Sequence, residues 1–205
     1  MSSAPSSGPP PIQQDLAGYE TLVAVCGGIA AYKTATLVSR LAQRGAGVSV
    51  LMTEAAQRFI TPLTFESLTA RRVFTSVWHS PDTHDPQHIR LTDAADLFII
   101  APATANTIGR LAAGLGDDVV TTTALTANCP ILLAPAMNTR MWENRIVQRN
   151  LATLEEYGYR QVPPESGWLA CRTIGAGRMA EPESILDAAL TLLKQSPPRS
   201  SVDGA

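Results

Sequence analysis

A cysteine and a histidine stand out in this 205-residue sequence because their surroundings suit acid–base or nucleophilic chemistry. Cys171 lies in residues 168–179, a glycine-containing segment typical of a flap over a site. Arg172 and Arg178 in the same segment are expected to lower its thiol pKa, which makes Cys171 a candidate proton donor or nucleophile. His88 precedes an ordered segment and is the best candidate for an acid–base group.

Two asparagines each follow a run of small residues at the end of an apolar stretch. Asn106 ends residues 101–106, and Asn138 ends residues 135–138. Small residues leave room for a flat ring, and an amide can hold a carbonyl, carboxylate or phosphate oxygen. Taken singly, a helix cap explains Asn106 better and a turn explains Asn138 better. Two such segments at strand ends favour a ligand site.

Gly27 and Gly28 separate an apolar stretch from a helical pattern. Without side chains they let backbone N–H groups approach an anion at a helix N-terminus, although an ordinary strand-to-helix turn explains the pair equally well. The segment fits neither the dinucleotide fingerprint nor the P-loop, which disfavours NAD and nucleoside triphosphates.

A metal site is the alternative that the histidines suggest. His84 and His88 have the i, i+4 spacing of a helical zinc pair, and His79 lies nearby. Pro86 between them disfavours a helix, and no cysteine or carboxylate cluster completes a ligand set. We therefore expect no metal.

Short apolar runs alternate with helical patterns along the chain, which predicts an α/β fold: a doubly wound, Rossmann-like or flavodoxin-like parallel sheet in three αβα layers. Ligands of such sheets bind beyond the carboxyl ends of the strands. The segment 71–92 reads as irregular and 165–179 as a loop. The predicted strands are 21–26, 48–52, 97–101, 131–134 and an edge strand at 161–162. The predicted helices are 29–44, one opening at 53–56 with Thr53 as its cap, 62–68, 104–113, 117–127, 143–157 and 182–194.

Composition indicates a single domain. Hydrophobic residues make up 45% and the net charge is −2, which suits a packed core and favours neither nucleic acid nor an anionic membrane as partner. We expect one domain over residues 19–195, between disordered segments 1–18 and 196–205. Three scattered cysteines, no signal sequence and no membrane-length apolar run predict a cytoplasmic protein, with Cys26 and Cys129 structural.

Four segments in order resemble the homo-oligomeric flavin-containing cysteine decarboxylase family: 27–33, 88–91, 135–142 and 170–179. The resemblance covers residues 21–185, and its Pro-x-Met-Asn-x-x-Met-Trp string is specific. It implies bound FMN and decarboxylation of 4′-phosphopantothenoylcysteine to 4′-phosphopantetheine in coenzyme A biosynthesis. The implied catalytic residues are His88, Cys171 and Asn138. The implied flavin contacts are Gly27, Gly28, Ile29, Thr53, Glu54, Ala55, Thr104, Ala105, Asn106, Thr107 and Ala136. The implied substrate contacts are Asn138, Met137, Ala170, Cys171 and Met179.

The resemblance also implies a homotrimer or a dodecamer, with the active site at a subunit interface. The family often has glycine after the flap cysteine, where this chain has Arg172. Some relatives carry an additional synthetase domain, for which 205 residues leave no room, so we expect the decarboxylase module alone.

A flavin suits this chemistry because decarboxylation of a cysteine needs an electron sink. Pyridoxal phosphate would need a lysine at a strand end, and the only lysines, Lys33 and Lys194, lie within or at the end of predicted helices. Transient oxidation of the thiol to a thioaldehyde, loss of CO2 and re-reduction avoid that requirement.

The alternatives within this fold are a peptidyl-cysteine decarboxylase, a non-catalytic flavin-binding regulatory subunit and a flavin prenyltransferase. A regulatory subunit would carry a long acidic tail, and residues 196–205 hold one acid, Asp203. A prenyltransferase would not need the Pro-Ala-Met-Asn string or a flap cysteine.

Overall fold

The computed structural model describes residues 14–78, 87–168, 170 and 172–199. His79, His84 and Cys171 lie outside the described residues, as do most of the residues assigned above to the two end segments.

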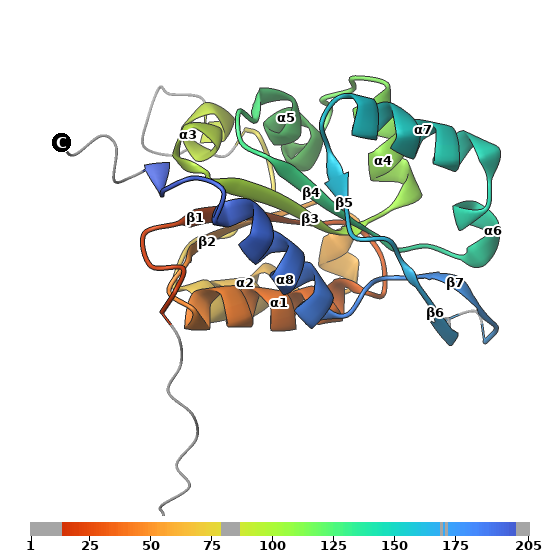
Figure 1. The fold of residues 1–205 in the computed structure, drawn as a ribbon, viewed down its shortest axis with the longest axis horizontal. Coiled ribbons are helices and arrows are strands. Elements are labelled where there is room, and N and C mark those ends of the chain that lie inside the picture. The colour runs from red at the N-terminus through yellow and green to blue at the C-terminus, as the bar shows by residue number, and fades with distance from the viewer. Residues whose placement is uncertain (1–13, 79–86, 169, 171, 200–205) are drawn as a thin grey trace, which may run out of the picture.

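Five parallel strands form one sheet in the order β2-β1-β3-β4-β5 (Figure 1). This confirms the predicted doubly wound α/β fold, in the flavodoxin-like strand order. The β3–β4 register shifts between Ile100 and Ala103. The strands are β1 (Glu20–Val25), β2 (Gly47–Met52), β3 (Leu97–Ala103), β4 (Ile131–Pro135) and β5 (Arg160–Gln161).

Helices cover both faces of the sheet, as Figure 1 shows. One face carries α1 (Ala31–Gln43), α2 (Pro62–Thr69) and α8 (Pro182–Leu193). The other carries α3 (Gln87–Ala94), α4 (Ala105–Ala112), α5 (Val119–Thr126) and α7 (Arg145–Glu156). The short elements η1 (Ala56–Arg58) and α6 (Thr139–Trp142) follow β2 and β4. None of the helices described here has the length and apolarity that crossing a membrane requires.

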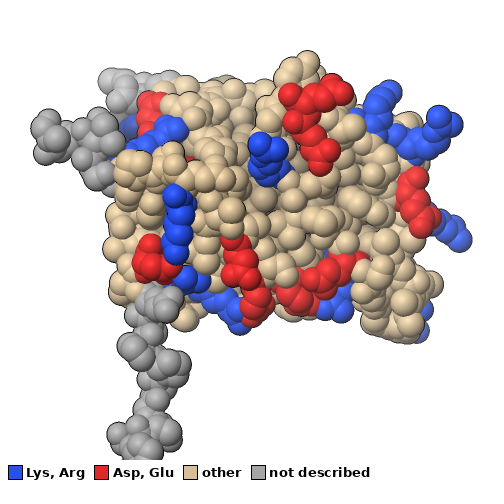
Figure 2. Space-filling model, viewed as in Figure 1, with Lys and Arg blue, Asp and Glu red and all other residues tan. Residues whose placement is uncertain are grey.

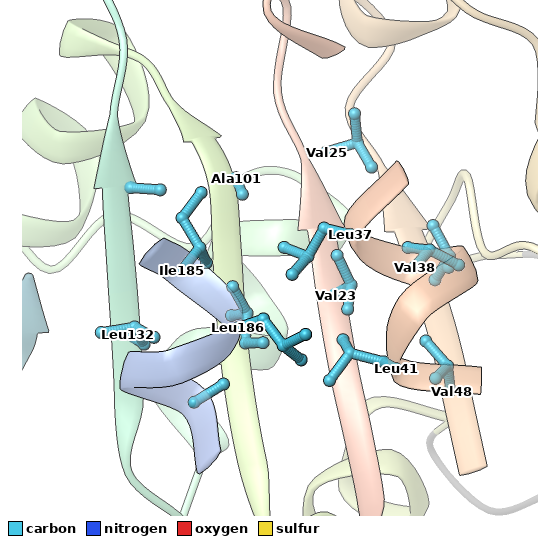
Figure 3. Packing of buried hydrophobic residues seen from close by; sticks show 14 of the residues in the cluster. Val23, Val25, Leu37, Val38, Leu41, Val48, Ala101, Leu132, Ile185 and Leu186 are labelled. Atoms are coloured by element: carbon cyan, nitrogen blue, oxygen red, sulfur yellow. The ribbon is translucent and has the colours of Figure 1, made fainter. Parts of the chain in front are cut away.

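The core lies in two layers, one on each side of the sheet. On the first side, Leu37, Val38 and Leu41 of α1 pack over β1 and β2 (Figure 3). Ile185 and Leu186 of α8 lie over β3 and β4 (Figure 3). Strands β1, β3 and β4 are buried on both faces, as their largely apolar sequences require.

Two of the segments read as irregular contain regular structure. Within 165–179, β6 (Glu165–Trp168) and β7 (Ile174–Arg178) pair as an antiparallel hairpin, which projects from one end of the sheet in Figure 1. Its glycines lower the strand propensity, so the loop prediction was wrong. The end of 71–92 belongs to α3, an eight-residue helix whose Thr92 is buried. This places His88 in a helix.

The observed helix boundaries differ from the predicted ones where polar side chains cap short turns. The predicted helix 143–157 corresponds to α7, which begins at Arg145 because the Asn144 side chain accepts a hydrogen bond from Ile146 N–H, and the separate short helix α6 precedes it. Thr53 Oγ1 accepts from Ala56 N–H at 3.2 Å, as a cap should, but the helix that follows is the single 3₁₀ turn η1.

Packed structure extends beyond the predicted limits of 19–195. Leu16 is fully buried in the core, and the Arg199 backbone N–H donates to Asp96. The Asp15 carboxylate receives hydrogen bonds from Arg44 at 2.8 and 2.7 Å and from Lys194 at 2.9 Å. These bonds join the chain before β1 to the ends of α1 and α8.

The ion pairs of Asp15 make stability depend on pH. The hydrogen bonds from Arg44 and Lys194 lower the pKa of Asp15 from its usual 3.8. Because the folded-state pKa is the lower one, the stabilisation is complete above about pH 4 and is lost as pH falls through the folded-state value. We expect Asp15→Asn to cost about 1 kcal/mol of unfolding free energy at pH 7. Urea unfolding should show this difference shrinking towards pH 2. A Glu156→Gln control on α7 should unfold like the parent, and a pH-independent deficit in Asp15→Asn would contradict the account.

Candidate cofactor and substrate site

A cavity of about 850 Å³ opens beyond the carboxyl ends of β1, β2, β3 and β4. It lies where the chain leaves β1 for one side of the sheet and β3 for the other, which is the usual ligand position in doubly wound sheets. Every flavin contact that the resemblance implies lines it, except Ile29. The lining residues are Gly27, Gly28, Thr53, Glu54, Ala55, Arg58, Thr104, Ala105, Asn106, Thr107, Arg110, Asp117, Asp118, Ala136, Met137 and Met141.

The two glycines after β1 have different reasons to lack a side chain. A Cβ on Gly27 would lie 2.5 Å from the Cβ of Ala55, so the loops after β1 and β2 touch there. A Cβ on Gly28 would approach no protein atom closer than 3.9 Å. Gly27 therefore allows protein packing, whereas a side chain on Gly28 would occupy the cavity.

Helices α1 and α4 begin at the cavity wall. α1 follows Gly28 and has no side-chain cap, and α4 is capped by Thr104, whose Oγ1 accepts from Thr107 N–H at 3.3 Å. Helix N-termini favour anions and acceptor oxygens. Asn106 is exposed in the first turn of α4, so Thr104 and not Asn106 is the cap.

Charged residues that the sequence analysis did not assign to the site form one wall of the cavity. Arg110 pairs with Asp117 at 2.8 Å and with Asp118 at 3.2 Å, and Arg58 also lines the space. Asp118 caps α5 through Val120 N–H and Thr121 N–H. The sequence places Asp117 and Asp118 only at the start of the predicted helix 117–127, because their pairing with Arg110 of α4 depends on the tertiary fold. On the face drawn in Figure 2, Lys and Arg side chains are interspersed with Asp and Glu side chains.

The Pro-Ala-Met-Asn loop after β4 is held by the β6–β7 hairpin. Met137 N–H donates to the Gly177 carbonyl at 2.9 Å, and Thr139 Oγ1 donates to the Ala176 carbonyl at 2.8 Å. A Cβ on Gly177 would lie 2.3 Å from the Met137 carbonyl oxygen, so this close approach requires glycine, which also has a φ of +118°.

Asn138 lies at the start of α6. Its Oδ1 accepts from Arg140 N–H at 2.9 Å and so orients the amide. Asn138 is therefore the cap of α6, and Nδ2 is the donor end of its side chain.

The remaining predicted site residues lie apart from the cavity lining. His88 is half-buried on α3, Ile29 is mostly exposed beside the start of α1, and Ala170 is exposed in the hairpin. The Met179 side chain is buried in the core. The candidate nucleophile Cys171 lies outside the described residues. A single chain therefore gathers the implied flavin contacts, but it does not bring His88 to them.

The other two thiols are buried, as expected for structural cysteines. Burial raises the pKa of Cys26 to about 12, although a hydrogen bond with Thr107 acts in the opposite direction. Burial likewise raises the pKa of Cys129 to about 11. Neither thiol is available as a thiolate near neutral pH.

Comparison with known proteins gives related sequences of two lengths. The chain is 48% identical over 168 residues to the coenzyme A biosynthesis bifunctional protein CoaBC of Bacillus subtilis, covering 82% of this chain and 41% of that protein. It is 46% identical over 167 residues to a probable phosphopantothenoylcysteine decarboxylase of Streptococcus mutans, covering 80% of this chain and 93% of that one. The chain thus spans less than half of its bifunctional relative from Bacillus subtilis.

Solved structures show the same architecture. A PPC decarboxylase mutant complexed with pantothenoylaminoethenethiol is 32% identical, with a TM-score of 0.76 over 87% of this chain and 99% of that one. The FMN-dependent cysteine decarboxylase SpaF is also 32% identical, with a TM-score of 0.77 over 88% and 98% of the two chains. Residues 11–194 match the flavoprotein family, and this protein therefore belongs to that family.

Proposed function

We propose that this protein binds FMN in the cavity beyond β1 and β3 and uses it to decarboxylate 4′-phosphopantothenoylcysteine to 4′-phosphopantetheine. One observation carries the proposal. The cavity lined by small residues adjoins the Pro-Ala-Met-Asn loop, at the carboxyl ends of the neighbouring strands β3 and β4. The names of relatives at 46 and 48% identity support this substrate over a peptide. The free, buried thiols of Cys26 and Cys129 suit a reducing compartment such as the cytoplasm.

The chemistry of the cavity fits FMN. Gly28, Ala55 and Ala136 leave space for a ring system, and about 850 Å³ is within the range of cofactor sites. The uncapped start of α1 supplies backbone N–H groups suited to a phosphate, and Arg58 adds a positive charge to the lining. Thr104, Asn106 and Thr107 supply polar groups for orientation.

Bound FMN supplies a reversible two-electron acceptor, which permits the carbon bearing the thiol to be oxidised before CO2 leaves and reduced afterwards. The residues of this chain bind and orient the substrate and move protons. Asn138 Nδ2 holds the substrate carboxylate, with its amide oriented by Arg140 N–H. His88 serves as the acid–base group, and Cys171 donates a proton to the enethiolate that remains after CO2 is lost.

A complete site then requires a second copy of the chain, because His88 does not line the cavity of its own chain. Apolar side chains more than half exposed lie on the segments that border the cavity: Ile29 and Tyr32 at the start of α1, and Phe59 and Leu63 beside η1 and at the start of α2. Exposed apolar surface of this kind marks interaction sites. A homotrimer, or a dodecamer built from trimers, with the active site between subunits accounts for both observations.

The activity is tested by purifying the full chain, recording its visible spectrum and following CO2 release from 4′-phosphopantothenoylcysteine. We expect a yellow protein that releases CO2 from this substrate and not from a peptide ending in cysteine. Release from the peptide alone would make the protein a peptidyl-cysteine decarboxylase. A yellow protein inactive on both would be a flavin-binding regulatory subunit, and failure to take up FMN would contradict the proposal altogether.

The two glycines of the cavity provide a matched pair of variants. Gly28→Ala should leave the unfolding free energy within about 1 kcal/mol of the parent, because the new Cβ meets no protein atom, yet it should lower FMN affinity about tenfold or more. Gly27→Ala should weaken both stability and FMN binding, because its Cβ meets Ala55. Thermal unfolding without FMN and flavin fluorescence titration measure the two effects. Unchanged FMN affinity in Gly28→Ala would show that the flavin binds elsewhere.

Subunit sharing is tested by mixing inactive variants. His88→Asn and Asn138→Asp should each lose nearly all activity as pure proteins. If a site combines His88 of one chain with Asn138 of another, co-refolding them in equal amounts should restore about a quarter of parental activity, because that fraction of sites receives both native residues. Activity measured after gel filtration provides the readout. A mixture as inactive as its components would place both residues in one chain.

A further inference from the structure

Lys33 is a buried cation that the proposed chemistry does not use. It lies near the start of α1 with 8% of its surface exposed, and lysine is almost never buried to this extent without a partner. Burial lowers the pKa of Lys33, and the charge of Arg178 acts in the same direction. An ammonium group in this place is therefore costly unless hydrogen bonds compensate for its lost hydration.

Two acceptors at the base of the β6–β7 hairpin supply that compensation. Lys33 Nζ donates to the Met179 carbonyl at 3.1 Å, in a buried hydrogen bond, and to Glu181 Oε1 at 3.0 Å. The same carboxylate oxygen pairs with Arg178, the last residue of β7. The Glu181 backbone N–H donates to the Glu165 carboxylate at 3.3 Å, and Glu165 lies opposite Arg178 in the strand register of the hairpin. Lys33 thus binds the segment at which both hairpin strands meet the body of the protein.

The hairpin carries this constraint to the substrate side of the cavity. Gly177 lies two residues before Met179, and its carbonyl accepts from Met137 N–H at 2.9 Å. Thr139 is bonded to Ala176, one residue earlier along β7. Met137 lines the cavity, and Asn138 lies between these two contacts. Lys33 is therefore connected to the loop that carries Asn138 by its hydrogen bond to Met179, the two-residue step of backbone back to Gly177, and the hydrogen bond from Met137.

We propose that Lys33 is a positioning residue, which sets the place of the Met137–Asn138 loop by tying the base of the β6–β7 hairpin to the helix that follows the glycine pair. Lys33 links the two sides of the site, since its own helix α1 begins at the cavity and its partners Met179 and Glu181 follow β7, which holds the opposite loop. The consequence for catalysis rests on the function proposed above, whereas the mechanical link does not.

Hydrogen exchange on the full chain tests the link without substrate. Lys33→Met keeps the aliphatic stem and removes the ammonium group. We expect amides in residues 135–142 and 174–181 to exchange about tenfold faster or more, while α7 exchanges as in the parent. The chain provides a matched control in Lys194→Met, its only other lysine, which pairs with Asp15 and should leave both segments unchanged. Unchanged exchange in Lys33→Met, or an equal increase throughout the sheet and helices, would overturn the proposal.

A second variant covers the case in which Lys33→Met does not fold. Glu181→Gln removes the counter-charge and keeps an acceptor oxygen, so it should accelerate exchange in the same two segments by a smaller factor. No change there would also overturn the proposal.

Activity then separates positioning from general damage. The folded Lys33 variant should keep its FMN dissociation constant within about twofold of the parent and lose about tenfold in kcat/KM. Equal losses in FMN affinity and kcat/KM would assign Lys33 to cofactor binding instead. If the parent protein itself releases no CO2, the proposed function fails, and the exchange results still decide the structural link.

Discussion

The reversal of the chain between β1 and β3 is the constraint on which the candidate site depends. After β1 the chain crosses to β2 on one side, and β3 and β4 lie on the other side, so the segments that follow β1 and β3 diverge and leave a space between them. The sheet can hold this arrangement because strands β1 to β4 are almost wholly buried and helices cover both faces of the sheet. Gly28 and Ala136 keep the space open because they carry little or no side chain.

A second set of contacts builds the substrate side on this frame. The hairpin approaches the segment after β4 so closely that a Cβ on Gly175 would collide with Thr139 and one on Gly177 with Met137. The loop is therefore positioned by backbone hydrogen bonds to β7, and β7 is in turn fixed at its end by Glu181, Arg178 and the buried Lys33. Cofactor and substrate sides are thus joined through one cation. The ion pair between the buried Lys33 and the partly exposed Glu181 gains little net stability, because the loss of hydration offsets the attraction, and the role proposed for it is to hold a particular geometry.

The sequence was sufficient for the sheet, and the family resemblance named flavin contacts of which all but Ile29 line the observed cavity. The strands could be predicted because continuous apolar runs between glycine or proline signals have few alternatives. The hairpin was missed because its glycines serve a tertiary contact with Met137 and Thr139, which no local pattern reveals. For the same reason Arg110 with its acidic partners, and Lys33 with Met179, were not assigned to the site. Their roles depend on segments distant in the chain that meet only in the folded protein.

The most direct test of the central claim is a structure of the full chain crystallised with FMN. The flavin should lie between the Gly27–Gly28 turn and residues 104–107, with its ring system beside Ala136 and Met137. A flavin bound elsewhere would contradict the account, for example in the separate cavity lined by Leu111, Cys129 and Tyr159.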